Sequence, residues 1–331
     1  MADKTFGVGI IGLGMGHECG KWVRTSPNCK VACVCDVDDA KIKRSVDEFQ
    51  CAGEKSYDKM LDRKDVDIVY VVTPSGTHAD LGVKAAHKGK HVCVAKPMDV
   101  SLENCDRLID ACAKNGVICT VDFQGRLTDL MQQVRYAVDN NLFGKMILGE
   151  ARLKWYRSNE YYAAGGWRGT WKMDGGGSLA NQAIHQIDQL QWLLGEVESV
   201  TAAEVGIFNH DKIETEDMGM AFLKFKNGAR GAILGTTTYT KDFYAGLEIH
   251  GSEGAIYAVR GDPVWLFHDE TRLQKLQRAS HFTTMVENMA AVLNGKADKL
   301  ICDGKEGRKS VEVLTAVYKC ARERKEIKFP L

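Results

Sequence analysis

The sequence has no excess of charge of either sign, because 44 lysine and arginine residues balance 44 aspartate and glutamate residues. Binding to DNA or RNA depends on neutralising many phosphates, so no nucleic acid is an expected partner. The sequence also lacks an apolar run near the ~20 residues that span a bilayer, and a strand pattern begins too early for a signal peptide. We therefore expect a cytoplasmic protein, away from membranes, that acts on small molecules.

Cysteine patterns typical of zinc sites or redox motifs are missing. The 11 cysteines are odd in number, form no Cys-x-x-Cys pair and do not cluster with histidine. Cys33 and Cys35 alternate along an expected strand, and Cys105 and Cys112 share one face of an expected helix. These positions suit small buried apolar residues. The sequence predicts reduced cysteines and no metal site.

The chain of 331 residues is long enough for two domains. Its first part alternates apolar strands with amphipathic helices, which predicts an α/β fold with a doubly wound parallel sheet. The expected strands cover residues 5–11, 30–36, 68–73, 91–95 and 117–121, and the expected helices cover residues 40–49, 79–88 and 101–115. We assign residues 1–122 to a Rossmann-type domain.

The remaining part, residues 123–331, contains successive strand patterns without helices between them, at residues 145–156, 199–208, 218–226, 229–239 and 244–250. This predicts an α+β domain with an open mixed, largely antiparallel sheet. Asn227-Gly228 predicts a hairpin turn with positive φ at both residues. A helix expected near residues 305–324 is a candidate to pack back on the first domain.

Alternating apolar residues predict that one face of this second sheet is uncovered. We place Ala221, Leu223 and Phe225 on that face, together with Ala232 and Leu234. A large exposed apolar face favours self-association. We expect a homodimer or homotetramer formed through the C-terminal sheet.

A glycine-rich loop follows the first strand, with Gly12, Gly14 and Gly16 ahead of a helix. Glycines in this setting let the backbone approach a pyrophosphate at a helix N-terminus, although a merely tight turn is the alternative. The third glycine of the usual fingerprint is replaced by His17. Asp36 ends the second strand, where a carboxylate binds ribose hydroxyls and repels a 2′-phosphate. NAD is therefore favoured over NADP, unless Asp36 is an ordinary turn aspartate.

Two further segments lie at the carboxyl edge of the expected parallel sheet, where open α/β sheets bind ligands. The first is Thr73-Pro74-Ser75-Gly76-Thr77-His78, and the second is Lys96-Pro97, which follows a buried strand. An ammonium at this edge orients a substrate hydroxyl and stabilises alkoxide character as hydride leaves. The alternative for Lys96 is a surface lysine that extends into solvent.

A second glycine-rich segment, at residues 175–177, precedes a helix that carries Asn181, His185 and Asp188. Spacings of four and three residues place these side chains on one helical face. Histidine is suited to general acid–base chemistry, although a hydrogen-bonded core histidine is an equally common outcome of this spacing. The glycines favour the functional interpretation because they allow close approach of a ligand.

Taken together, these residues resemble the family of glucose-fructose oxidoreductase, inositol dehydrogenase and rhizopine-catabolism oxidoreductases, the Gfo/Idh/MocA family. The resemblance spans nearly the whole chain. It rests on the GIIGLG opening, TPSGTH, AKP, the triple-glycine helix with its histidine, His250-Gly251-Ser252-x-Gly254, and the ending DGKEGRKSVEVL to IKFP.

The resemblance implies an NAD(P)-dependent dehydrogenase that moves hydride between the nicotinamide and a secondary alcohol of a sugar, glycoside, nucleotide sugar or inositol. It implies Lys96, His185 and Asn181 as catalytic residues, with His185 as the general acid/base. The cofactor contacts would be Gly12, Gly14, Met15, Gly16, Asp36, Thr73, Pro74, Ser75, His78, Lys96, Trp167 and Arg168. The substrate contacts would be Lys96, Gln124, Arg126, Tyr156, Asn181 and His185.

This chain departs from the family pattern at two positions. The family commonly has Glu-Lys-Pro, whereas Ala95 precedes Lys96 here, so a carboxylate beside the lysine is missing. Many members carry aspartate four residues before the histidine, whereas this chain has Asn181, as in members that act on nucleotide sugar acids and glycosides. Asp188 is a candidate replacement for that carboxylate, or only an anchor of the helix. A cofactor-binding sensor without turnover is the alternative function.

Overall fold

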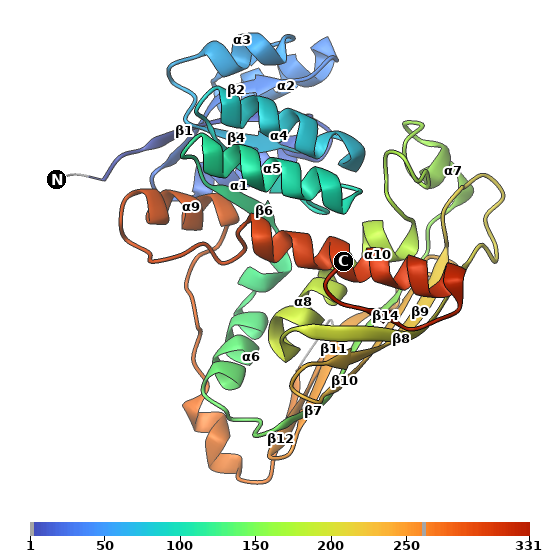
Figure 1. Cartoon of the computed structure of the whole chain (residues 1–331). Coiled ribbons are helices and arrows are strands. Elements are labelled where there is room, and N and C mark those ends of the chain that lie inside the picture. The colour runs from blue at the N-terminus through green and yellow to red at the C-terminus, as the bar shows by residue number, and fades with distance from the viewer. Residues whose placement is uncertain (1–2, 260–262) are drawn as a thin grey trace. The chain divides into compact units, whose positions relative to one another are not determined.

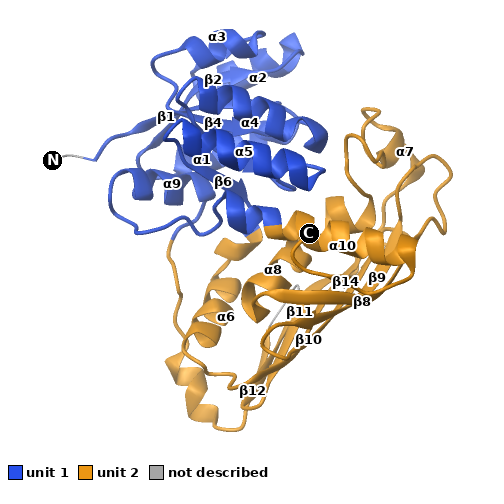
Figure 2. Cartoon of the chain, viewed as in Figure 1, with its two compact units in different colours: residues 1–124, 282–308 blue, residues 125–281, 309–331 orange. Residues whose placement is uncertain are grey.

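The computed structural model describes residues 3–259 and 263–331, which form two compact units (Figure 2). Unit 1 comprises the chain up to Gln124 together with Phe282–Arg308, and unit 2 comprises Gly125–His281 and Lys309–Leu331. A single boundary at residue 122 was expected from the sequence, whereas in the structure residues 282–308 belong to unit 1. The return of the chain to unit 1 has a packing cause, because Val286 and Met289 join the same apolar core as Val8.

Unit 1 is built on six parallel strands in the order β3-β2-β1-β4-β5-β6, which confirms the predicted doubly wound α/β sheet (Figure 1). The strands are β1 (Phe6–Ile11), β2 (Cys29–Cys35), β3 (Ala52–Glu54), β4 (Ile68–Val71), β5 (His91–Ala95) and β6 (Cys119–Asp122). Strands β1 and β4 are buried along their whole length. Continuous apolar runs of this kind are typical of parallel strands covered on both faces.

Several helices of unit 1 begin at a polar side chain that caps the first turn. The helical elements of this unit are α1 (Gly16–Thr25), α2 (Asp39–Phe49), α3 (Tyr57–Asp62), η1 (Ser75–Thr77), α4 (His78–His87), α5 (Leu102–Lys114) and α9 (Met285–Leu293). Asp38 accepts hydrogen bonds from the first turn of α2, and Ser101 does the same for α5. Helices α4 and α5 lie side by side on one face of the sheet (Figure 1). Right-handed crossovers in the opposite direction place α1 and α2 on the other face.

Unit 2 contains an eight-stranded sheet in the order β13-β12-β11-β7-β10-β9-β8-β14. The strands are β7 (Met146–Lys154), β8 (Val197–Gly206), β9 (Met218–Phe225), β10 (Arg230–Thr236), β11 (Tyr244–Gly251), β12 (Gly254–Val259), β13 (Val264–Phe267) and β14 (Ile327–Lys328). Only the described pair β7–β10 is parallel, which confirms the mixed, mostly antiparallel sheet. The helical elements are η2 (Gln124–Leu127), α6 (Asp129–Asp139), α7 (Asn159–Ala163), η3 (Ser178–Ala183), α8 (Ile184–Leu194), η4 (Glu270–Lys275) and α10 (Gly304–Glu323). The unit boundary falls within α10.

The hairpin between β9 and β10 forms where it was predicted, but its turn type was predicted wrongly. Gly228 has φ +92°, whereas Asn227 is not among the residues with positive φ. The Gly228 amide donates to the carbonyl of Phe225, and the Phe225 amide donates to Ala229. This is a three-residue loop closed by a glycine in the left-handed region. The Asn227 amide group donates to the carbonyl of Leu194 instead.

One face of the unit 2 sheet is covered by helix α8, whose Leu190 and Leu194 pack against Gly149 of β7. Ala221, Leu223 and Phe225 lie buried on this covered face, so their predicted exposure is wrong. The opposite face carries Met220 and Phe222, which are 41% and 56% exposed. Their register partners are Leu234 and Ala232, the two residues of the prediction that do belong to this face.

No helix among the described residues is both long and apolar enough to cross a membrane. All 11 cysteines are free thiols. The described part of the chain also holds no cluster of histidine, cysteine, aspartate and glutamate side chains with the composition of a metal site.

Candidate cofactor and substrate sites

The glycine loop between β1 and α1 leaves room for a ligand at one of its glycines. Gly12 has φ +89°, and a Cβ there would lie 2.5 Å from the carbonyl oxygen of Val72, so the turn itself requires glycine. A Cβ on Gly14 would meet nothing within 4 Å. Packing within the chain therefore does not require glycine at position 14, whereas close approach of a pyrophosphate does. The residues of this loop fit a dinucleotide.

The third fingerprint glycine normally allows the helix to pack closely on the strand. In this chain Gly16 allows that packing, although His17 occupies the third fingerprint position. A Cβ on Gly16 would lie 3.1 Å from Ile10 of β1, so Gly16 permits the close packing of helix on strand. His17 is buried, with Nδ1 2.8 Å from the Ser45 hydroxyl and the ring stacked on Phe49 at 5.1 Å. It ties α1 to α2 beside the loop. The substitution at the third fingerprint position thus leaves the helix–strand contact intact.

Asp36 is joined directly to the glycine loop. Its Oδ2 accepts a hydrogen bond from the Leu13 amide at 2.6 Å, and its Oδ1 accepts from the Asp38 amide at 3.0 Å. An ionised carboxylate has about four acceptor sites, so it retains capacity for ribose hydroxyls. The bond to Leu13 holds this carboxylate beside the loop that precedes α1.

The segment after β4 is organised by His78. Its Nδ1 lies 2.8 Å from the Pro97 carbonyl oxygen, and its Nε2 lies 2.8 Å from the Thr73 carbonyl oxygen. Burial lowers the pKa of His78, while these two carbonyl contacts act in the opposite direction. The imidazole therefore connects the Thr73–Thr77 turn to the Lys96-Pro97 segment. Ser75 is buried, and the hydroxyls of Thr73 and Thr77 bond to each other at 2.7 Å.

Asp122 was not among the predicted site residues, yet it lies on the strand next to Lys96. It is the register partner of Ala95, the residue before the lysine. Its Oδ2 accepts hydrogen bonds from the Tyr70 hydroxyl and from Gln124 Nε2, the latter at 3.1 Å. Burial raises the pKa of Asp122 to about 6, although the two hydrogen bonds and the positive charge of Lys96 each lower it. Gln124, expected as a substrate contact, thus also binds a carboxylate at this edge.

Asn181 lies in a π-helical turn, η3, that leads into α8. The prediction that Asn181 and His185 share one helical face relied on regular α-helical spacing. The structure differs from it because Asn181 lies in a π-helical turn, which has more residues per turn. The Asn181 side chain donates to Asp174 Oδ1 at 2.6 Å and accepts from Gln182 Nε2 at 2.9 Å. Asp174 is fully buried and also accepts from the Gly169 amide. A carboxylate is therefore present beside Asn181, supplied by Asp174.

Two of the three glycines before η3, Gly176 and Gly177, are required by packing inside unit 2. A Cβ on Gly176 would lie 2.1 Å from the Tyr318 hydroxyl, and one on Gly177 would lie 1.9 Å from the Glu216 carbonyl oxygen. The Glu216 carboxylate accepts from the amides of Gly177 and Leu179 and from Tyr318. Burial raises its pKa to about 7. These two glycines thus allow the chain to pass a buried carboxylate, which the ligand-based interpretation did not foresee.

Arg126 and Asp188 form a pair that the sequence did not predict. Arg126, expected as a substrate contact, has a fully buried side chain whose guanidinium donates twice to Asp188. Asp188 also accepts from the Ser310 hydroxyl at 2.9 Å. Of the two roles left open for Asp188, these contacts favour the anchor of the helix.

The arginines of the segment after β7 stack on aromatic rings. Arg157 lies over Trp155 and Tyr161 and pairs with Asp242 at 3.0 Å. Arg168 lies over Tyr161 and Trp167 at 4.8 and 4.9 Å. Its Nη1 donates to the Ala164 carbonyl at 2.9 Å, whereas its buried Nε meets no hydrogen-bond acceptor and no carboxylate pairs with it within the described part of the chain. Arg168 therefore retains hydrogen-bonding capacity for a ligand.

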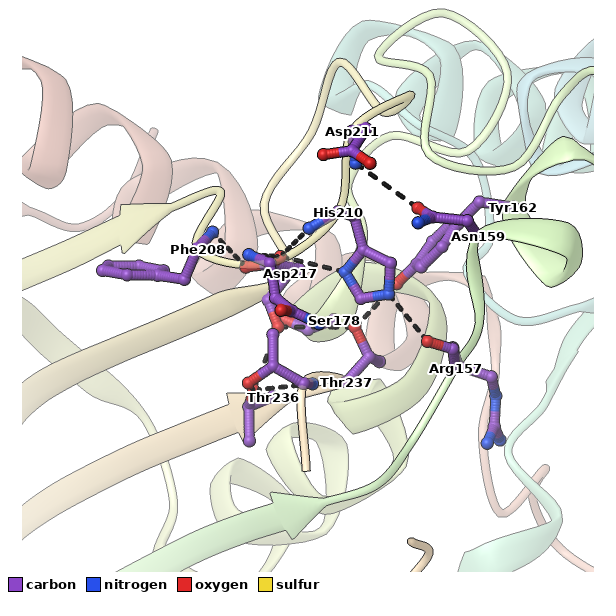
Figure 3. A network of polar contacts seen from close by, with 12 residues as sticks. Arg157, Asn159, Tyr162, Ser178, Phe208, His210, Asp211, Asp217, Thr236 and Thr237 are labelled. Atoms are coloured by element: carbon purple, nitrogen blue, oxygen red, sulfur yellow. Dashed lines mark hydrogen bonds and ion pairs between the residues drawn. The ribbon is translucent and has the colours of Figure 1, made fainter. Parts of the chain in front are cut away.

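Nearby, Tyr156 is 46% exposed. The backbone that carries it is fixed by a buried network (Figure 3). His210 Nε2 donates to the Arg157 carbonyl at 2.7 Å, and Nδ1 lies 2.9 Å from Asp217. The Tyr162 ring packs edge-on against His210, and its hydroxyl bonds to Thr237 of the strand connection at 2.8 Å. This network holds the Tyr156–Arg157 segment against the sheet.

Comparisons with known proteins agree with this architecture. Residues 6–123 match the oxidoreductase family with an NAD-binding Rossmann fold, and residues 131–257 match the GFO/IDH/MocA C-terminal domain. The chain is 28% identical to scyllo-inositol 2-dehydrogenase (NAD(+)) of Bacillus subtilis over 75% of this chain and 72% of that protein. It is also 28% identical to 2,7-anhydro-N-acetylneuraminate hydratase of Mediterraneibacter gnavus, over 76% of this chain and 67% of that protein.

Among solved structures, the WlbA dehydrogenase from Chromobacterium violaceum, in complex with NADH and UDP-GlcNAcA, is similar over the full length. Its TM-score is 0.91 and its sequence is 31% identical, covering 100% of this chain and 98% of that one. The chain therefore belongs to the GFO/IDH/MocA family and is an oxidoreductase whose first unit is an NAD-binding Rossmann fold.

Proposed function

We propose that the protein is an NAD-dependent dehydrogenase that moves hydride between the nicotinamide and a secondary hydroxyl or keto carbon of a sugar or cyclitol. The observation that carries this proposal is the combination of open space at Gly14 with Asp36 bonded to the same loop. Bound NAD supplies the hydride acceptor. The expected contacts of the cofactor are the loop glycines, Met15, the Thr73–His78 segment, Lys96, Trp167 and Arg168.

Asp36 supports NAD as the preferred cofactor. Its carboxylate is fixed next to the loop by the Leu13 amide, where it accepts hydrogen bonds from ribose hydroxyls. A 2′-phosphate brings negative charge to the same place, and the like charges repel each other. NADP should therefore bind more weakly than NAD.

Lys96 and His185 act on different atoms of the substrate hydroxyl, Lys96 on the oxygen and His185 on the proton. The Lys96 ammonium holds the oxygen and stabilises its developing negative charge. His185 accepts the hydroxyl proton during oxidation and returns it during reduction, as a general acid/base. Asn181, held by Asp174 and Gln182, presents an amide of fixed orientation in the turn before His185. Oxidation of a secondary alcohol thus yields a ketone, NADH and a protonated His185.

The substrate class favoured by the charges of unit 2 is a pyranose with an anionic group, such as a uronic acid or a nucleotide-linked sugar. Arg126 pairs with Asp188 and Arg157 pairs with Asp242. Arg168 donates from Nη1 to the Ala164 carbonyl and has no carboxylate partner among the described residues, so its remaining donors serve an anionic group of either the cofactor or the substrate. A guanidinium donates two parallel hydrogen bonds to a carboxylate or phosphate. The complex of the WlbA dehydrogenase with UDP-GlcNAcA supports the same class. Neutral pyranosides and inositols are the competing substrates.

The test is the absorbance of reduced nicotinamide when the protein and NAD meet uronic acids, nucleotide sugars, neutral pyranosides and inositols separately. We expect turnover with an anionic sugar, and His185→Ala should abolish it while NAD binding persists. Turnover only with neutral substrates would overturn the anionic class but keep the dehydrogenase. NAD binding without turnover on any substrate would favour a sensor protein.

We further propose that the uncovered face of the unit 2 sheet binds a second copy of this chain. The apolar side chains Met220 and Phe222 lie on β9, and Leu266 lies at the far side on β13. Between them, β7 carries Glu150 paired with Arg152. A two-fold axis through such a face brings apolar residues onto apolar residues and opposite charges onto each other. A homodimer or homotetramer is the expected state.

A further inference from the structure

The carboxylate expected in the residue before Lys96 has a counterpart on the neighbouring strand. Ala95 occupies that position on β5, and its register partner on β6 is Asp122. Register partners in neighbouring strands point to the same face of the sheet, about 4.8 Å apart. A carboxylate at position 95 and the carboxylate of Asp122 would therefore occupy adjacent places on one face.

Tyr70, on strand β4 next to β5, fixes the position of the Asp122 carboxylate. It pairs with Cys93 on β5, which in turn pairs with Thr120 on β6, so Tyr70 lies on the same face as Asp122. Its hydroxyl donates to Asp122 Oδ2, which also receives the Gln124 amide. Tyr70 is 3% exposed and Asp122 is 8% exposed, so the contact is shielded from solvent. A buried carboxylate held in this way has a fixed position relative to the end of β5.

The charges of Asp122 and Lys96 interact. The positive charge of Lys96 is among the causes that hold down the pKa of Asp122 against the effect of burial. This coupling is mutual, so the Asp122 carboxylate favours the ammonium form of Lys96 by the same interaction. Ionised Asp122 thus supplies the negative charge near Lys96 that Ala95 cannot supply.

We infer that Asp122 is the positioning residue of Lys96: the carboxylate that accompanies the lysine in Glu-Lys-Pro relatives has moved from β5 to β6 in this chain and is held there by Tyr70. Its catalytic consequence rests on the proposed function, in which Lys96 holds the substrate oxygen. The charge coupling itself does not depend on any substrate.

The first test measures the pKa of Lys96 without turnover. Reductive ¹³C-dimethylation of the lysines, with the Lys96 signal assigned from Lys96→Arg, gives this pKa by NMR titration of the NAD-free protein. We expect Asp122→Asn to lower the Lys96 pKa by about one unit or more. The double variant Asp122→Asn/Ala95→Glu should restore it, because it returns the carboxylate to β5. An unchanged Lys96 pKa in well-folded Asp122→Asn would overturn the inference.

Tyr70→Phe provides a second test that keeps the carboxylate. The Lys96 signal should show a small transition near pH 6 in the unaltered protein, which reports ionisation of Asp122. Removing the Tyr70 donor should move this transition to higher pH, because that hydrogen bond stabilises the ionised form. Absence of such a transition in the unaltered protein would contradict the coupling even if Asp122→Asn does not fold.

Steady-state kinetics separate this inference from the proposed function. With a substrate that gives turnover, Asp122→Asn should lower kcat about tenfold or more, with KM for NAD little changed, and Ala95→Glu in the same chain should recover most of the loss. A shifted Lys96 pKa without turnover on any substrate would leave the coupling intact and overturn only the dehydrogenase assignment.

Discussion

Arg126 and Asp188 form a bidentate ion pair that is closed to solvent, with Nε and one terminal nitrogen of the guanidinium each 2.8 Å from a carboxylate oxygen. The pair joins the turn before α6 to the middle of α8. Trp192 lies 5.0 Å from the guanidinium carbon, and Ser310 supplies a third hydrogen bond to the carboxylate. The helix that carries His185 is thus fixed by a charge pair whose members are 62 residues apart.

Breaking this pair should destabilise unit 2 strongly. Arg126→Met leaves the Asp188 carboxylate buried with the hydrogen bond from Ser310 but without its cation, and an uncompensated buried charge costs about 3–5 kcal/mol. We expect a loss of that size in the free energy of unfolding measured with urea. Arg126→Met/Asp188→Leu, which removes both charges, should recover much of it. Arg63→Ala, which breaks a more exposed pair with Asp65, is the control and should cost under about 1 kcal/mol.

Asp36→Ala should weaken NADH binding more than NADPH binding. The variant loses the acceptor for the ribose hydroxyls, worth about 1.5–3 kcal/mol or about 10- to 100-fold in Kd, but it also removes repulsion of the 2′-phosphate. Fluorescence titration with each reduced cofactor measures both constants. Asp38→Ala is a matched control, because its carboxylate caps α2 two residues away. Equal losses for both cofactors would show that Asp36 does not contact the ribose.

Lys96→Ala should retain NAD binding and lose turnover by about two orders of magnitude or more, the scale of a positioned group that stabilises charge in the transition state. Stopped-flow absorbance of NADH formation gives the rate, and calorimetric titration gives the NAD affinity. Lys90→Ala, at a lysine bound to two backbone carbonyls before β5, controls for loss of a nearby positive charge. Unchanged turnover in Lys96→Ala would remove the lysine from the mechanism.

Strand positions in unit 1 were predictable because each depends on a local pattern. The run from His91 to Ala95 is apolar and ends at a lysine and a proline, and β5 has the same bounds. Short edge strand β3 was missed, because Ala52–Glu54 offers three residues without a buried run. Local chemistry also predicted that Lys96 follows the carboxyl end of a strand.

Contacts between distant residues were not predictable in the same way. Asp122 is one residue beyond the strand expected at 117–121, and only the register of β5 with β6 brings it opposite Ala95. The π-helical turn at Ser178–Ala183 breaks the regular spacing on which the shared face of Asn181 and His185 was based. The Glu216 carboxylate, which accepts hydrogen bonds from the Gly177 and Leu179 amides at this turn, comes from the segment just before β9. The sequence did offer one indication of Asp122, because a carboxylate directly after a parallel strand lies at the edge of the sheet that binds ligands.

Stability should fall as pH rises through the range from about 4.5 to about 7. Burial raises the pKa of Glu216 from 4.5 to about 7 and that of Asp122 from 3.8 to about 6. Between the unfolded and folded values, the folded protein binds more protons, so the free energy of unfolding decreases with pH and the full benefit exists only below the unfolded pKa. Glu216→Gln should remove on the order of 2–3 kcal/mol of this pH dependence. Urea unfolding at about pH 5 and about pH 8 measures it; Glu270→Gln, at an exposed glutamate, is the control and should preserve the slope.

Phe222→Asp should shift the protein toward monomer. Phe222 is 56% exposed on the uncovered sheet face, next to Ala232 on β10, and burying an aromatic side chain there in a dimer contributes about 2–3 kcal/mol. A carboxylate at this position opposes association twice, because the apolar contact is lost and a charge must be desolvated without a partner. Leu273→Asp, at a 42% exposed leucine on η4 outside the sheet, is the matched control. Light scattering after size exclusion gives the mass of each variant at equal concentration. A monomeric mass for Phe222→Asp alone supports the sheet face as the interface, whereas an unchanged oligomer would place the interface elsewhere on the chain.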